Sequence, residues 1–240
     1  MRLFPGAPTA MQTGNRKTRT IRSFVRRAGR LTDSQKRALA ELGPSLIVKY
    51  AEEHVSYSDV FGRVAPVVLE IGFGNGETLV EQAASDAGRD YIGIEVHEPG
   101  VGHCLLKADE ADVGNLRIIM HDAVEVLVHQ VPQASLDRLN LYFPDPWPKK
   151  RHHKRRIVQD RFVELVADRL CDGGAFHVAT DWENYAEQMM DVLTTAEGLT
   201  NTCPPGEFAP RPDFRPLTKF ELRGERLGHG VWDLLFTRDS

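Results

Sequence analysis

Short apolar segments alternate with helical segments from Val67 onwards, and this alternation constrains the fold more than any other feature of the chain. Strands joined through helices at this spacing predict βαβ units, and hence a parallel sheet covered on both faces. The expected strands are 67–71, 90–95, 116–120, 136–142 and 174–179. The expected helices are 77–86, 100–111, 123–130, 156–170 and 183–196.

The C-terminal segment departs from this pattern. Lys219–Leu227 and Val231–Thr237 flank Gly228-His229-Gly230, which is typical of a hairpin with a three-residue loop. The sequence therefore predicts an α/β fold that is Rossmann-like. Its mostly parallel seven-stranded sheet would carry helices on both faces and end in a C-terminal antiparallel hairpin.

A single domain is expected, because 240 residues suffice for one α/β domain. We expect residues 1–30 to form a basic, largely flexible N-terminal arm and residues 31–240 to form the domain. The domain should begin with a short helix from Ser34 to Leu42, capped by Thr32 or Asp33.

Charge is distributed unevenly along the chain. The formal net charge is −4, yet residues 1–30 carry eight Lys or Arg and no acid, and residues 149–156 carry six more. Elsewhere 16 basic residues stand against 34 acidic ones. An acidic body repels polyanions except at its basic segments, so these two segments are candidate contacts for a nucleic acid.

Cysteine and histidine patterns exclude several kinds of site. Cys104, Cys171 and Cys203 include no C-x-x-C pair, and the nine His include no H-E-x-x-H, so we expect neither a disulfide framework nor a metal site. No apolar run approaches the roughly 18 residues that span a membrane, and Met1–Met11 lacks a signal-peptide core. A cytoplasmic protein with no membrane partner is expected.

A glycine-rich turn, Glu70-Ile71-Gly72-Phe73-Gly74-Asn75-Gly76, lies where the first strand meets the first helix. Glycines there let a ligand approach the backbone closely. A dinucleotide site would have its third glycine where this chain has Glu77, and that carboxylate would lie against the pyrophosphate. The G-x-G-x-G spacing, with an acid two residues before it, instead resembles the class I S-adenosylmethionine methyltransferases, whose cofactor is cationic and has no phosphate.

Two further carboxylates end the next strands. Glu95 closes the second strand, nineteen residues after Gly76, where an acid can accept both ribose hydroxyls. Asp122 follows the third strand and can face the adenine amino group, or can cap the helix that begins at Ala123. Acids at consecutive strand ends, where open α/β sheets bind ligands, favour an S-adenosyl-L-methionine site.

The most specific segment is Pro144-Asp145-Pro146-Trp147-Pro148-Lys149-Lys150, which is followed at once by Arg151-His152-His153-Lys154-Arg155-Arg156. A proline-stiffened loop at a strand end can present a carboxylate and an aromatic ring at fixed positions. The basic run can hold a phosphodiester backbone. Together they indicate chemistry on a nucleobase. The alternative is a rigid surface turn before a solvated helix.

These motifs together resemble the bacterial tRNA (guanine-N7-)-methyltransferase family, from about residue 20 to the C-terminus. The matching segments are Arg22–Phe24, Arg30–Thr32, Glu70–Gly76, Gly93–Glu95, Phe143–Lys150, Ala179–Asp181 and Arg215–Gly224. The match at 20–34 favours an RNA-contacting arm over a mitochondrial transit peptide, which the Arg-rich start also imitates.

The resemblance implies methyl transfer from S-adenosyl-L-methionine to N7 of a guanosine in tRNA, forming 7-methylguanosine in the variable loop, at position 46. With the glycine turn, it implies cofactor-binding residues Glu70, Gly72, Gly74, Gly76, Glu95, Asp122 and Asp145. It implies substrate-binding residues Lys149, Asp181, Thr218, Lys219, Phe220 and Glu221. The RNA-contacting residues would be Arg151, His152, His153, Lys154, Arg155 and Arg156. No obligatory protein partner is expected, and a monomer and a homodimer both remain open.

Residue chemistry suits this reaction. Guanine N7 is an unprotonated lone pair, so catalysis needs no general base and should come mostly from positioning. Asp145 is the catalytic candidate, because a nearby carboxylate stabilises the cationic ring that forms. Asp181 could accept guanine N1–H and the exocyclic amine, while Trp147 could stack on a base or pack inward. Thr218 and Glu221 reach the site only if the tail folds back over the strand ends.

Two other interpretations remain. One is a methyltransferase for an adenine amine or a small molecule, since D-P-W-P distantly resembles D-P-P-Y loops. The Lys149–Arg156 run has no use with a small substrate. The other is an RNA-binding module on an inactive methyltransferase fold, which the carboxylates at every expected acidic cofactor position disfavour.

Overall fold

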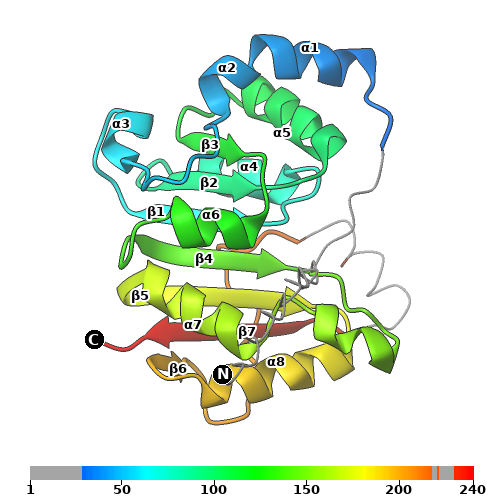
Figure 1. Cartoon of the computed structure of the whole chain (residues 1–240), viewed down its shortest axis with the longest axis vertical. Helices are drawn as coiled ribbons and strands as arrows, with labels where there is room; N and C mark the ends of the chain where they lie inside the picture. The colour runs from blue at the N-terminus through cyan, green and yellow to red at the C-terminus, as the bar shows by residue number, and fades with distance from the viewer. Residues whose placement is uncertain (1–28, 218–220, 222–229) are drawn as a thin grey trace, which may run out of the picture.

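The computed structural model describes residues 29–217, 221 and 230–240. Most of the expected arm, and Thr218, Lys219 and Phe220, lie outside these residues. Seven strands form one sheet in the order β3-β2-β1-β4-β5-β7-β6 (Figure 1). They are β1 Val67–Ile71, β2 Asp90–Ile94, β3 Leu116–Ile119, β4 Leu136–Tyr142, β5 Leu170–Thr180, β6 Leu199–Asn201 and β7 Trp232–Arg238.

Strands β1 to β5 pair in parallel, and β7 runs antiparallel to both β5 and β6. The expected α/β class, with a mostly parallel sheet and antiparallel C-terminal strands, is confirmed. Strand β7 lies between β5 and the three-residue strand β6. The first arm of the expected hairpin, Lys219–Leu227, stays a prediction. Of that segment the structure describes only Glu221.

Helices cover both faces of the sheet (Figure 1). They are α1 Asp33–Glu41, α2 Gly43–Leu46, α3 Tyr57–Phe61, α4 Glu77–Ser85, α5 Glu98–Glu110, α6 Ala123–His129, α7 Asp160–Arg169 and α8 Glu183–Thr195. One core joins the sheet to α6, α7 and α8, and the other joins it to α1, α4 and α5. Because β1 is buried on both faces, its five residues are all apolar except Glu70.

Two helix starts differ in how well the sequence predicts them. Thr32 caps α1 in a capping box with Gln35, as the sequence predicts for this position. The helix expected from 156 to 170 is corrected. Lys150–Arg155 form a 3-10 helix, η1, and α7 begins only at Asp160. The backbone of Arg156 between them is extended (φ −57°, ψ 134°), which separates the two helices.

The strand order alone predicts where a ligand should bind. The chain runs from β1 outward to β2 and β3, and returns to β4 on the other side of β1. Ligands of open α/β sheets bind at the carboxyl ends of the strands where this reversal occurs. In this fold that position lies between the ends of β1 and β4. Among the described residues, no helix is both long and apolar enough to cross a membrane.

Candidate active site

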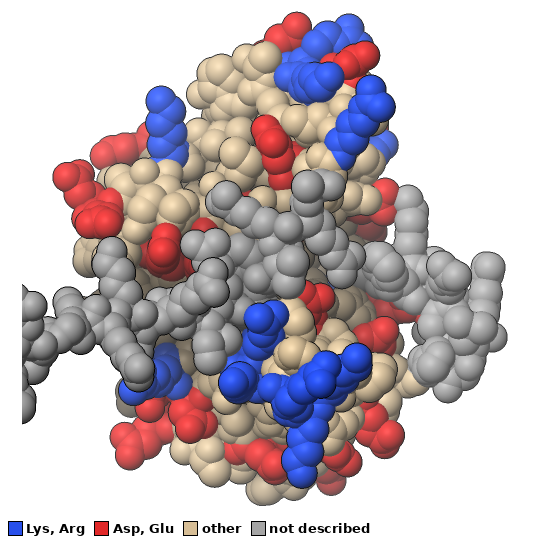
Figure 2. Space-filling view, turned by 45° about the vertical axis from the view of Figure 1, so that its right-hand side comes forward, with Lys and Arg blue, Asp and Glu red and all other residues tan. Residues whose placement is uncertain are grey.

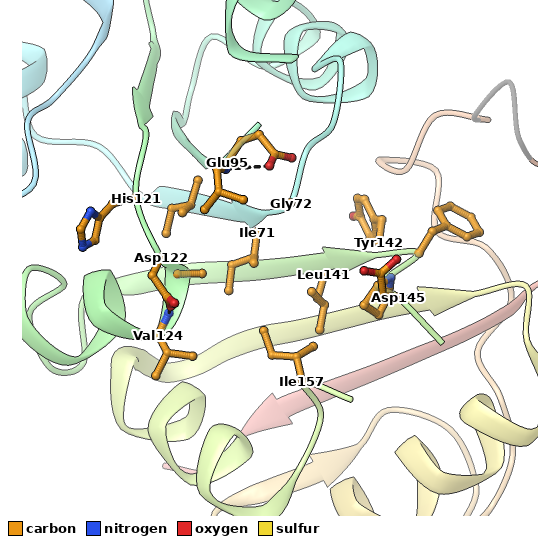
Figure 3. Close-up of a pocket in the computed structure, with 15 residues that line it drawn as sticks. Ile71, Gly72, Glu95, His121, Asp122, Val124, Leu141, Tyr142, Asp145 and Ile157 are labelled. Carbon is orange, nitrogen blue, oxygen red and sulfur yellow. Dashed lines mark hydrogen bonds between the residues drawn. The ribbon is translucent and has the colours of Figure 1, made fainter. Parts of the chain in front are cut away.

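A cavity of about 240 Å³ opens where the strand order predicts it, at the carboxyl ends of β1, β2 and β4. Ile71, Leu141 and Ile157 form an apolar wall, and Figure 3 shows Asp122 and Asp145 at opposite ends of it. The fifteen lining residues, all from the described part of the chain, include the carboxylates of Glu95, Asp122 and Asp145 and no Lys or Arg. Such a lining suits a cationic ligand with an apolar body, and it offers no counter-charge to a diphosphate.

The glycine turn wraps one side of the cavity. Gly72, Gly74 and Gly76 all have positive φ (73°, 60° and 76°), a conformation in which other residues are strained. A Cβ at Gly76 would also lie 2.4 Å from Cys104 Sγ. Only Gly72 of the three lines the cavity. Gly74 and Gly76 allow the backbone to turn and to pack closely against α5.

Glu95 ties this turn to the end of β2. Its Oε2 accepts a hydrogen bond from Gly74 N (2.9 Å), and Oε1 accepts from Val96 N and His97 N (2.6 and 2.9 Å). An ionised carboxylate has about four acceptor sites, so roughly one remains for a ligand. Glu95 therefore braces the site as well as lining it.

Asp122 lies at the end of the cavity that is opposite Asp145 (Figure 3). Its Oδ1 accepts from Val124 N (2.9 Å) and caps α6, so the capping interpretation is confirmed, and the side chain lines the cavity too. Beside it stands His121, which the sequence-based set did not contain. The His121 ring stacks on Tyr50 with 3.7 Å between ring centroids. No sequence signal links Tyr50 to this site, because the contact is made only by the fold.

Glu70 occupies a different position from the one predicted. Successive residues of a strand point to opposite faces, so Ile71 lines the cavity while Glu70 points towards α4. There Glu70 is buried and accepts a hydrogen bond from Gln82 Nε2 (3.3 Å), close to Arg138. Burial raises the pKa of Glu70 to about 7. The side chain is therefore a buried neighbour of the site and not part of the cavity lining.

The loop that carries Asp145 is held on both sides. Phe143 and Trp147 have positive φ (50° and 44°), which is uncommon for residues other than glycine. Phe143 N donates to Ala179 O (2.8 Å), and Arg156 Nε donates to Pro146 O (2.9 Å). Between these two anchors Asp145 is exposed at the cavity rim.

Arg156 is therefore corrected from an RNA contact to a loop anchor. Only 2% of it is exposed, and its guanidinium also donates to Gln188 Oε1 (2.5 Å) and Asn184 Oδ1 (3.0 Å) of α8. The Arg156 guanidinium also lies over the Tyr185 ring, 4.6 Å from the ring centroid. The signal that was missed is the pair of amide side chains on α8, which only the folded chain brings to Arg156.

The rest of the basic segment lies on the surface. Lys149, Arg151 and Lys154 are exposed, and Figure 2 shows Lys and Arg side chains gathered on this side of the molecule. The Arg155 guanidinium lies over the Trp147 ring (4.7 Å), and the His152 ring is 5.9 Å from it. Trp147 thus packs against the basic helix, and the stacking of a base on it stays a prediction. His153 is partly exposed and contacts Arg156.

A buried network of polar side chains begins at Tyr142, which lines the cavity. The Tyr142 hydroxyl lies 3.0 Å from His177 Nδ1, and His177 Nε2 lies 2.7 Å from Asp233 Oδ1. Arg215 donates to both Asp233 oxygens (2.8 and 2.8 Å) and pairs with Glu221 (2.6 Å). This network joins β4, β5 and β7 to Arg215 and Glu221. Glu221, the one described residue of 218–229, is buried against Arg215, and the folding of the tail over the strand ends stays a prediction.

Two predicted substrate residues lie outside the cavity lining. Asp181 is exposed directly after β5, and Lys149 is exposed at the start of η1. Both stand at the carboxyl edge of the sheet, on the loops beside the cavity. Thr218, Lys219 and Phe220 fall outside the described residues.

A seven-stranded sheet of this order, with a glycine turn and acids at consecutive strand ends, defines a class I S-adenosylmethionine-dependent methyltransferase. Comparison with known proteins agrees. A family model described as a putative methyltransferase matches residues 64–234. The crystal structure of the 16S rRNA methyltransferase KamB superimposes with a TM-score of 0.57 at 15% identity, over 81% of this chain and 99% of that one. That likeness concerns the fold.

Closer relatives specify the family. The tRNA (guanine-N(7)-)-methyltransferase of Aeromonas hydrophila is 61% identical over 220 residues, which are 92% of this chain and 93% of that protein. The protein of the same name from Yersinia enterocolitica is 58% identical over 223 residues, 93% of each. The chain belongs to the tRNA (guanine-N(7)-)-methyltransferase family.

Proposed function

We propose that this protein transfers a methyl group from S-adenosyl-L-methionine to N7 of a guanosine in tRNA, in the cytoplasm and without an obligatory protein partner. The observation that carries the proposal is a cavity to which the described residues contribute three carboxylates and no Lys or Arg, beside an exposed cationic helix. The first feature fits a cationic cofactor, and the second fits an RNA backbone. Position 46 in the variable loop is the target that the family resemblance implies.

In this proposal, different cavity residues contact different parts of the cofactor. When bound, S-adenosyl-L-methionine supplies a methyl group on a positively charged sulfur. Asp122 and His121 would hold the adenine end, and Glu95 would accept a ribose hydroxyl with its remaining acceptor site. Asp145 would stand at the reacting end, where its carboxylate faces positive charge before and after transfer. Ile71 and Leu141 would form the apolar wall between these ends.

At the acceptor atom, the protein's task is positioning. Guanine N7 carries a lone pair and no proton, so no side chain has to act as a base there. Holding two reactants in line can supply several kcal/mol of the barrier reduction. We assign guanine recognition to Asp181, and backbone contacts to Lys149, Arg151 and Lys154, because these side chains are exposed on loops beside the cavity.

Nucleoside mass spectrometry tests this function. Purified protein, S-adenosyl-L-methionine and an unmodified tRNA transcript should yield 7-methylguanosine. A methylated adenosine, or transfer to a small molecule with none to tRNA, would favour the competing methyltransferase. Specific tRNA binding with no methylated nucleoside would favour an inactive RNA-binding module.

A further inference from the structure

Trp182 is the one aromatic residue among the large apolar side chains that the described part of the chain leaves exposed, with 40% of its surface accessible. It follows β5 directly and forms the N-cap of α8. Its backbone is fixed, because Trp182 N donates to Thr180 Oγ1 (3.2 Å) and Trp182 O accepts from Tyr185 N and Ala186 N (2.9 Å each). An indole ring on a rigid backbone is thus presented to solvent at the carboxyl edge of the sheet.

The loop that carries Trp182 begins next to the loop that carries Asp145. Tyr142 and Ala179 are paired across β4 and β5, and Phe143 N donates to Ala179 O (2.8 Å). The loops that leave these two strands therefore start side by side. Asp145 stands on one loop, and Asp181 and Trp182 stand on the other.

The charges around Trp182 favour a base over a phosphate. Asp181 and Glu183 adjoin Trp182 in the sequence, and both are exposed. Carboxylates repel phosphates, but they accept hydrogen bonds from guanine N1–H and its exocyclic amine. The cations lie on η1 nearby, which Arg156 ties to α8 through Asn184 (3.0 Å); Figure 1 shows η1 beside the start of α8. The exposed acids and the cations thus lie on separate, neighbouring segments.

We propose that Trp182 is the platform on which the target guanine stacks, with the edge of that base turned to Asp181. The inference rests on the proposed function. It replaces Trp147, the aromatic residue that the sequence suggests, since the Trp147 ring already packs against Arg155. Stacking of a base on an aromatic side chain contributes about 1–3 kcal/mol.

Affinity for an unmodified tRNA transcript tests the proposal. Trp182→Ala should weaken binding roughly tenfold, whereas Trp182→Phe should stay within about threefold, because phenylalanine keeps an aromatic face. The slope of log affinity against log salt should not change, because no phosphate contact is lost. Val128→Ala, an exposed apolar residue on α6, is the control and should have no effect. Unchanged melting temperature and S-adenosylhomocysteine affinity establish that each variant is folded, and Trp182→Leu replaces the alanine variant if that one is not.

Combining Trp182→Ala with removal of the target base tests whether the two contact each other. A tRNA with an abasic site at the target position should bind the wild-type protein about tenfold more weakly, and Trp182→Ala should then cost nothing further. Unchanged affinity of Trp182→Ala, or an equal loss on intact and abasic tRNA, would overturn the assignment. Failure of the proposed function would appear separately, as a wild-type protein that forms no 7-methylguanosine.

Discussion

Asp145 shows how much a single side chain depends on the backbone that carries it. Its loop contains two residues with positive φ, and hydrogen bonds from Phe143 and Arg156 hold the loop on either side. A carboxylate placed in this way is preorganised for charge at the cavity. The three prolines in the sequence predict a stiff loop, but they do not predict the anchor at Arg156.

Substitution of Asp145 by Asn should therefore impair the reaction and little else. The single-turnover rate should fall about 10²–10³-fold, the loss typical of removing one preorganised electrostatic group. Binding of tRNA and the melting temperature should change little, because Asn has the same shape. Rapid-quench measurements at saturating tRNA and cofactor give the rate, and Asp191→Asn on the exposed side of α8 is the matched control. If Asp145→Asn keeps more than about a third of the wild-type rate, Asp145 is excluded from this role.

At the level of elements, the chain shows which patterns predict structure. The five parallel strands and most helices follow from hydrophobic runs and glycine stops, and their ends differ from the expected ones by a few residues. The strand β6 escaped prediction because Leu199–Asn201 is too short to show a pattern. The helix expected over 156–170 begins four residues later, at Asp160, because composition cannot show that Arg156 turns inward to meet α8.

The basic helix provides a prediction with a built-in control. Neutralising Arg151 and Lys154 together should weaken tRNA binding and reduce the log–log salt slope by somewhat under one unit for each lost phosphate contact. Arg156→Gln should leave this slope unchanged, because the side chain is buried, and should lower the melting temperature instead. Filter binding across a salt series checks both. Equal slopes for the double variant and the wild type would mean that η1 is only a solvated surface.

For the whole molecule, burial of Glu70 has a consequence for stability. Burial raises its pKa to about 7 from an ordinary value of 4.5, so the folded state favours the protonated form. The contribution of Glu70 to the free energy of unfolding is therefore fully present below about pH 4.5 and is lost as the pH rises towards 7. At about 1.4 kcal/mol per pKa unit, the loss is of the order of 3 kcal/mol.

Glu70→Gln should remove this dependence. The difference in unfolding free energy between variant and wild type should move in favour of Gln between about pH 5 and pH 8 and then level off. Denaturant titrations at several pH values measure it, with Glu81→Gln on the exposed face of α4 as a control that should stay flat. A difference that is constant across this range would show that Glu70 is ionised in the fold throughout.

The site as a whole was predictable in part. Acids at strand ends and the Pro144–Pro148 loop identify the cavity edge, because strand order brings those ends together. Burial and side-chain direction were not predictable, which is why Glu70 and Arg156 proved to lie inside and His121 was missed. Long-range pairs such as Arg215 with Asp233 leave no local signal in one sequence.

Transfer to guanine N7 is tested most directly by changing that one atom. A tRNA that carries 7-deazaguanosine at the target position has C–H in place of N7 and keeps the same base-pairing edge. Incubated with the wild-type protein and methyl-labelled S-adenosyl-L-methionine, it should bind within about twofold of the unsubstituted tRNA and accept no label. The unsubstituted tRNA should be methylated. Label transferred to the deaza tRNA at a rate similar to that of the unsubstituted tRNA would contradict methylation at N7.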